Sequence, residues 1–78
     1  MKHYIAVIAE FNLTGQIIPL SIRLNNRRHE VDKVKYITTA ASLKSGGQGL
    51  RYTCKINGRE CYLFLEDNLW FIDQLDQE

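Results

Sequence analysis

Two cysteines and two histidines are the residues of this chain best suited to nucleophilic, redox or metal chemistry. Cys54 and Cys61 are separated by six residues and lack the Cys-x-x-Cys spacing that forms half of a tetrahedral zinc site. Neither His3 nor His29 has a nucleophile at a spacing that would form a catalytic pair. The sequence therefore predicts no catalytic constellation, no metal site and no cofactor.

Cations and aromatic rings alternate near the C-terminal end of the chain, and this mixture suits binding better than catalysis. The candidate binding residues are Arg51, Lys55, Tyr62, Phe64 and Phe71. Small barrels bind single-stranded nucleic acid in this way, because bases stack on the rings while Lys and Arg neutralise phosphates. Further basic residues that such a surface could recruit lie near predicted turns: Arg27, Arg28, Lys44 and Arg59.

The same residues are also compatible with a purely structural role or with protein binding. Arg51 could lie over Phe64 and Lys55 could pair with Glu60, in which case the rings are simply part of a packed structure. Alternatively, the rings form a surface for a protein partner or a second copy of the chain. We expect a non-enzymatic interaction module that binds an unknown protein or itself, with nucleic-acid binding as the alternative.

A hairpin centred on Asn57-Gly58 is the element that would position these side chains. Both central residues of a type I′ turn have φ > 0, and Asn followed by Gly meets this requirement at the lowest steric cost. The two-residue loop predicts six facing pairs: Ile56–Arg59, Lys55–Glu60, Cys54–Cys61, Thr53–Tyr62, Tyr52–Leu63 and Arg51–Phe64. A second turn at Asp67-Asn68 would set Trp70 opposite Leu65 and Ile72 opposite Leu63.

Cys54 and Cys61 face each other in this register, at a separation that would allow a disulfide. Two cysteines are too few for a secreted disulfide scaffold of this size. We expect free thiols that act as small buried hydrophobic groups in a reducing cytosol, with a redox or structural bridge as the alternative.

The N-terminal third predicts a second hairpin. In the strand Tyr4 to Phe11 we expect Ile5, Val7, Ala9 and Phe11 to face the core, and the apolar character of the other side predicts cover on both faces. In the strand Gln16 to Leu24, the alternation places Ile18, Leu20, Ile22 and Leu24 on one side. Pro19 cannot donate to a ladder, which predicts an edge strand or a position that faces away from a neighbour. The next turn is predicted at residues 25–28.

The segment from His29 to Leu43 is ambiguous. Its β-branched residues favour a strand over Glu30 to Ala40, with a bulge where Val31 and Val34 both need burial, and a helix is the alternative. The glycine-rich stretch Ser42 to Gly49 is predicted to be a connecting loop, because it lacks the Gly-Lys-Ser/Thr end of a phosphate-binding loop.

Length and composition predict one globular domain over residues 1–78, with 45% hydrophobic and 24% charged residues. No apolar run approaches the ~20 residues needed to cross a membrane, and Glu10 interrupts the first apolar segment, so we expect a cytoplasmic protein. Residues 1–65 hold all ten Lys and Arg and four acidic residues, whereas the last thirteen hold five acidic residues and no base. This asymmetry is compatible with an anionic partner.

Short strands separated by turns predict an all-β fold of five to six antiparallel strands, either a strongly bent sheet or a partly open barrel of the SH3-like or OB-like kind. The predicted core consists of Ile5, Val7, Ile18, Leu20, Ile22, Val34, Leu50, Tyr52, Cys54, Leu63, Leu65, Trp70 and Ile72.

The run from Ala40 to Ile72 resembles small proteins of unassigned function from Gram-positive bacteria, in which a glycine-rich loop precedes an Arg-Tyr strand and a Trp follows near the end. The resemblance implies a compact domain similar to a β-barrel. It implies no activity and no functional residues.

Overall fold

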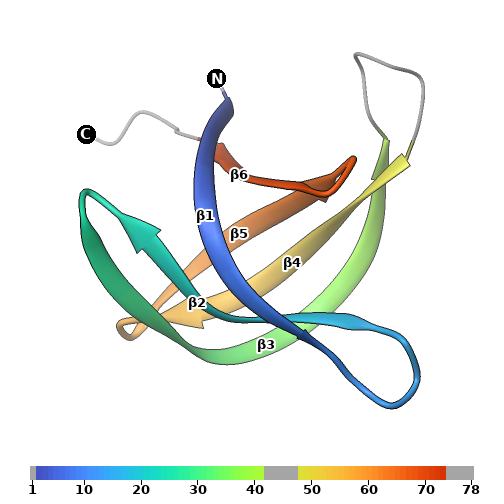
Figure 1. Cartoon of the computed structure of the whole chain (residues 1–78), viewed down its shortest axis with the longest axis horizontal. Coiled ribbons are helices and arrows are strands. Elements are labelled where there is room, and N and C mark those ends of the chain that lie inside the picture. Colours follow the sequence, from blue (N-terminus) through green and yellow to red (C-terminus); the bar gives the residue numbers. More distant parts are fainter. Residues whose placement is uncertain (1, 42–47, 74–78) are drawn as a thin grey trace.

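The chain folds into a closed barrel of six antiparallel strands (Figure 1). The computed structural model describes residues 2–41 and 48–73. The strands are β1 (Lys2–Phe11), β2 (Ile17–Leu24), β3 (Arg27–Ala41), β4 (Gln48–Ile56), β5 (Arg59–Glu66) and β6 (Leu69–Asp73). Each strand pairs with the next one in the chain, and β6 pairs back with β1. The all-β prediction is therefore confirmed, with six strands in a simple up-and-down order rather than a Greek key.

The helix considered for residues 29–43 is wrong, because β3 covers all of this segment that the structure describes. Within residues 2–41 and 48–73, no helix has the length and apolar character needed to cross a membrane.

Three two-residue turns fix the register of the barrel. Asn57 and Gly58 have φ values of 55° and 76°, and all six predicted pairs between β4 and β5 are observed. Asp67 and Asn68 also have positive φ, and Trp70 faces Leu65 as predicted. Ile72 instead pairs with His3 in β1, because the ladder between β5 and β6 ends at the preceding residue.

The turn between β2 and β3 is shorter than predicted. Asn25 and Asn26 have φ values of 54° and 63° and make the whole turn, so Arg27 already faces Leu24 in the ladder. Arg27 and Arg28 are therefore strand residues rather than turn residues.

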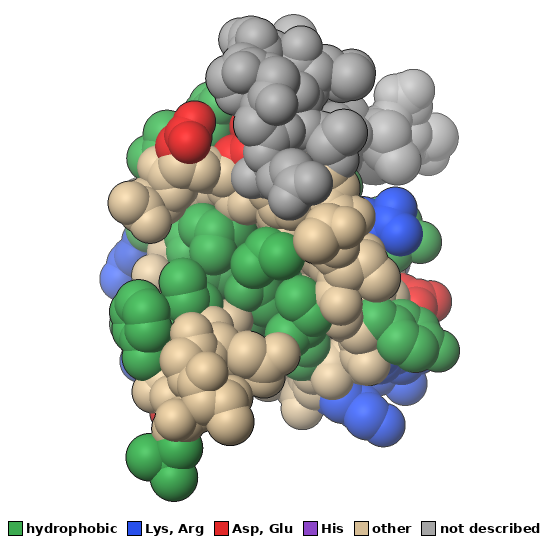
Figure 2. Space-filling view, turned by 90° about the vertical axis from the view of Figure 1, so that its right-hand side faces the viewer, with side chains coloured by type: hydrophobic (Ala, Val, Ile, Leu, Met, Phe, Trp, Pro, Cys, Tyr) green, Lys and Arg blue, Asp and Glu red, His purple; other side chains and the backbone are tan. Residues whose placement is uncertain are grey.

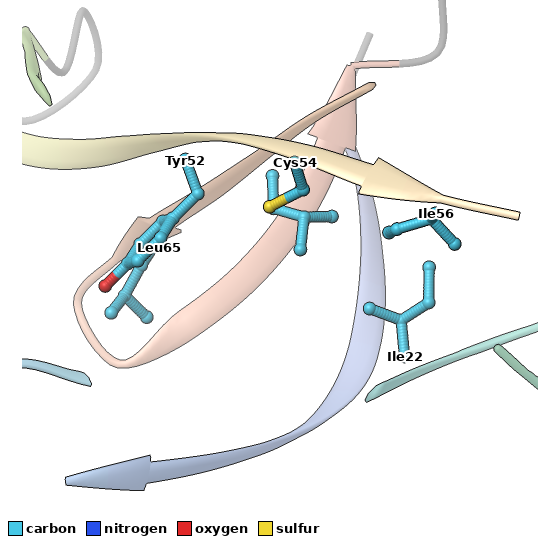
Figure 3. Packing of buried hydrophobic residues seen from close by; sticks show 6 residues of the cluster. Ile22, Tyr52, Cys54, Ile56 and Leu65 are labelled. Carbon is cyan, nitrogen blue, oxygen red and sulfur yellow. The ribbon is translucent and has the colours of Figure 1, made fainter. Parts of the chain in front are cut away.

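The barrel interior is filled from β2, β4 and β5. Tyr52, Cys54 and Leu63 are completely buried, and Ile22 points toward Ile56 across the interior (Figure 3). The hydroxyl of Tyr52 donates a 2.6 Å hydrogen bond to the carbonyl oxygen of Ile17, and burial raises the pKa of this hydroxyl. Other predicted core residues pack around this centre while remaining partly exposed: Ile5, Val7, Val34, Leu50, Trp70 and Ile72.

Leu20 is a wrong core prediction, because β2 contains a bulge. Ile8 pairs with Ser21 and Ala9 pairs with Pro19, so Leu20 is the extra residue between them. The bulge breaks the alternation: Leu20 is 40% exposed, whereas Pro19 and Ser21 are buried. Ile18, also predicted in the core, is half-buried and lies outside the core cluster.

The strand β1 is covered on one side only, contrary to the prediction. Ile5, Val7 and Ala9 face inward and are half-buried, as expected from their alternation. Ile8, on the other side, is 55% exposed. Phe11 lies on the inward side of β1 but at the end of the hairpin, beyond the barrel interior, and is therefore 75% exposed.

The strand β3 contains two register shifts, one between Val31 and Lys33 and one between Val34 and Tyr36. The first shift allows Val31 and Val34 both to pack against the core, which confirms the predicted bulge, and the second shift is an additional bulge. In the first shift, Asp32 accepts a 3.2 Å hydrogen bond from the backbone N–H of Gly58. The bulge therefore also holds the turn between β4 and β5.

Candidate functional site

Cations and rings gather on the outer surface of β3, β4 and β5. This surface, called the aromatic–cationic face below, consists of Lys33, Lys35, Tyr36, Arg51, Thr53, Lys55, Tyr62 and Phe64. Four of its members are predicted binding residues: Arg51, Lys55, Tyr62 and Phe64. They lie on the side of β4 and β5 opposite to the core, as the hairpin register predicted.

Two exposed tyrosines stand on either side of a small residue in the middle of this face. Thr53 pairs with Tyr36 in β3 and with Tyr62 in β5, so the three residues form one row across the strands. Tyr36 is 65% exposed and Tyr62 is 48% exposed, whereas Thr53 is 7% exposed. Two strand spacings put the tyrosine Cα atoms about 10 Å apart. The row therefore presents two exposed rings with a small buried side chain between them.

Arg51 lies over the ring of Tyr62, with its guanidinium carbon 5.1 Å from the ring centroid. The expected contact with Phe64 is wrong. Phe64 faces Arg51 in the ladder but stacks on Phe71, with ring centroids 5.0 Å apart and planes within 7°. Arg51 therefore brings a positive charge to an exposed ring instead of covering the half-buried ring of Phe64.

Phe71 lies on the predicted side of the sheet but is only 5% exposed. Phe64 stacks on one side of it, and Tyr4 of β1 contacts it edge-on at 5.6 Å between centroids. The Lys2 ammonium sits 4.7 Å from the Phe71 centroid and 3.1 Å from a carboxylate oxygen of Glu66. Phe71 therefore packs beside Phe64 and is covered by Tyr4 and Lys2, so it does not present a ring to a ligand.

Positive charge dominates one end of the face. Lys33 and Lys55 are directly opposite each other in the ladder between β3 and β4. Glu60 faces Lys55 in the ladder as predicted, but its carboxylate forms an ion pair with Lys35, at 3.6 Å between nitrogen and oxygen. The four cations of the aromatic–cationic face therefore outnumber the two carboxylates near them, Glu60 and Asp32. Such an arrangement attracts anions.

The supporting basic residues are not part of this face. Arg28 pairs with Glu30 at 3.0 Å and lines a shallow hollow on the outer side of β1 and β2. Arg27 begins β3, and Arg59 follows the turn after β4, where it faces Ile56. Lys44 lies outside the described residues.

Sequence reasoning missed three members of the face, Lys33, Lys35 and Tyr36. In a strand without a bulge, Tyr36 would point to the same side as Val34, which packs against the core. The register shift between these two residues places Tyr36 on the outer surface instead. Tyr36 can be assigned to the outer surface, opposite Thr53, only when the position of the bulge is known.

The cysteines face each other as predicted, and both are free thiols. Burial, followed by the neighbouring Cys61, raises the pKa of the Cys54 thiol to about 11. Burial and the nearby Glu60 carboxylate raise the pKa of Cys61 as well. Both thiols therefore carry their protons at neutral pH, which makes them poor nucleophiles and metal ligands. Over the described ranges, no three His, Cys, Asp or Glu side chains form a group that could hold a metal ion.

We expect the free energy of unfolding to fall as the pH rises from about 9 to about 11. The Cys54 thiol ionises near its ordinary pKa of 9.0 in the unfolded chain but only at about 11 in the folded chain. Below the lower value both states hold the proton, so this thiol adds no pH dependence to stability there; above it only the unfolded state releases the proton, and stability falls. Urea denaturation across this range measures the decline. Cys54→Val should make it shallower, and an equally steep decline in that variant would contradict the assignment.

Comparisons of the chain with protein-family models, curated proteins and solved structures found no match. The function must therefore be argued from the geometry of the barrel.

Proposed function

We propose that this barrel is a non-enzymatic binding module whose ligand is single-stranded nucleic acid, bound on the aromatic–cationic face. The observation that carries the proposal is the row Tyr36–Thr53–Tyr62, in which two exposed rings flank a buried small residue. Unpaired bases have exposed π-faces that stack on such rings, at about 1 to 3 kcal/mol per base. Bases within a duplex are already stacked on each other and cannot use them.

The cations around this row support the same proposal. Arg51 lies at the Tyr62 ring, and Lys33 and Lys55 face each other at the adjacent end of the face. A nucleotide chain whose bases stack on the tyrosines would keep its phosphates within the range of these charges. The strand order of the barrel leaves the face uninterrupted, because β3, β4 and β5 are neighbours.

Binding of a fluorescently labelled single-stranded DNA of mixed sequence tests the proposal. Affinity should fall steeply between about 50 mM and about 200 mM salt, because bound phosphates release counterions. The slope of log K against log salt should become less steep by about 0.7 in Arg51→Gln, which removes one phosphate contact. Arg23→Gln is the matched control, since Arg23 is an exposed cation on β2, away from the face.

Tyr36→Ala and Tyr62→Ala separate stacking from charge. Each should weaken single-strand binding by about 5-fold to 150-fold without changing the salt slope. Absence of binding at about 50 mM salt would refute the proposal. Equal competition by single-stranded DNA and by polyglutamate would also refute it, because the face would then recognise negative charge, as for an acidic protein partner.

A further inference from the structure

The part of β1 nearest the turn to β2, Val7–Phe11, has an open edge. β6 pairs with β1 only along Lys2–Ile5, and β3 pairs with β2 only along Ser21–Leu24. In the part of the chain that the structure describes, no strand pairs with the other edge of Val7–Phe11. Figure 1 shows this hairpin extending at the lower right, away from the closed part of the barrel. Five extended residues span about 16 Å, which is long enough to receive another strand.

Apart from the single charge of Glu10, this edge lacks the features that normally protect an exposed strand. Natural edges are blunted by proline, by lysine or by a bulge. Val7–Phe11 contains no proline and no lysine, and the bulge of the hairpin lies in β2, at Leu20. Ile8 and Phe11 are 55% and 75% exposed. The edge therefore combines unpaired backbone groups with exposed apolar side chains.

The opposite edge of the hairpin, along Ile17–Leu20, also has no strand paired with it among the described residues, but it is less suited to receive one. Pro19 has no backbone N–H and is fully buried. The carbonyl of Ile17 accepts the hydrogen bond of the Tyr52 hydroxyl from across the barrel. Pairing of Val7–Phe11 with the same edge of a second copy uses up both edges, so it ends with two copies instead of continuing into a filament.

The low charge of the hairpin allows a second copy to be the occupant. Residues 5–22 contain a single charged side chain, Glu10, so two of these hairpins can approach each other with little repulsion. Figure 2 shows the side of the molecule that lies at the right of Figure 1. Hydrophobic side chains gather at the centre of this side, and charged side chains lie toward its margins. Depletion of charge at the centre is typical of protein interfaces.

We propose that two copies of this chain associate through Val7–Phe11, paired antiparallel about a two-fold axis. A register centred on Glu10 would place two carboxylates directly opposite each other, which destabilises a cross-strand pair. A register centred on Ala9 instead puts Glu10 opposite Ile8 of the partner subunit and Phe11 opposite Val7 of the partner subunit. The dimer therefore uses the register centred on Ala9 and covers the exposed side chains of Ile8 and Phe11.

Sedimentation equilibrium of the full chain from about 10 μM to about 1 mM tests the dimer. Ile8→Glu places a carboxylate opposite Glu10 of the partner subunit at two symmetric positions, and the dimer Kd should rise about tenfold or more. Adding Glu10→Lys to Ile8→Glu converts both repulsive pairs into attractive ones and should restore most of the affinity. Leu69→Glu is the matched control, because Leu69 is 54% exposed on β6 and lies outside this edge.

A chain that stays monomeric at every concentration would overturn the proposal. If the edge instead receives a strand from a different protein, the isolated chain would also stay monomeric, and the proposal would be wrong. Equal weakening by Ile8→Glu and Leu69→Glu would also overturn it, as would failure of Glu10→Lys to restore the dimer. If Ile8→Glu does not fold, hydrogen exchange of the unaltered chain decides. Amides in Val7–Phe11 should become more protected as concentration rises, and unchanged protection overturns the proposal.

Discussion

Truncation of Leu63 to alanine is expected to lower the free energy of unfolding by about 2 to 5 kcal/mol. Leu63 is completely buried on β5, and it faces Tyr52, which is also completely buried. Removing the side chain deletes apolar contacts and leaves a cavity that the closed ladder around it can fill only in part. Denaturation with urea, monitored by the fluorescence of Trp70, measures the loss.

Leu69→Ala is the matched control for Leu63→Ala. Leu69 is 54% exposed at the start of β6, so the same truncation should change stability by no more than about 0.5 kcal/mol. A loss of less than about 1 kcal/mol for Leu63→Ala would contradict the inward orientation of alternate residues in β5.

The parts of the fold that local chemistry determines were predictable from the sequence. Asn57-Gly58 carries its own backbone preference, and a two-residue loop leaves one register for the strands beside it. The predicted pairs therefore hold from the turn out to Arg51 and Phe64. Because this turn fixes the register, four binding candidates lie on the same side of the sheet: Arg51, Lys55, Tyr62 and Phe64.

The bulges were harder to predict, because an extra residue is a property of two paired strands rather than of one segment. Leu20 follows the alternation of β2 in the sequence, yet the pairing with β1 passes over it. In β3 the need to bury Val31 and Val34 indicated one bulge, whereas the second, just before Tyr36, had no comparable signal. This second shift is what brings Tyr36 into the row with Thr53.

Closure of the barrel accounts for the burial of Phe71, which could not be predicted. Its position on the outer side of the sheet follows from the turn at Asp67-Asn68, but its exposure depends on β1, which is distant in sequence. Tyr4 faces Phe71 from that strand and covers the edge of the ring. A sequence can indicate which side of a strand a residue occupies more readily than it can indicate which distant strand covers that side.

Replacing Phe71 with alanine is expected to lower the free energy of unfolding by about 3 to 5 kcal/mol. Its ring is 5% exposed and fills the space between Phe64 and Tyr4 on the outer side of the sheet, with Lys2 above it. The loss would weaken the junction between β1 and β6, which closes the barrel. Urea denaturation measures it, and Tyr62→Ala is the control, because the 48% exposed ring of Tyr62 should contribute less to stability.

Phe71→Leu then distinguishes a supporting ring from a ligand-binding one. Leucine fills most of the buried space, so this variant should fold and keep its affinity for single-stranded DNA within about twofold. Tyr62→Ala should show the opposite behaviour, with a modest change in stability and a marked loss of binding, because its ring is exposed beside Arg51. If Phe71→Leu retained its stability but lost binding as completely as Tyr62→Ala, Phe71 would have to contact the ligand itself. Tyr4 and Lys2, which cover its ring, would then have to move away to admit the ligand.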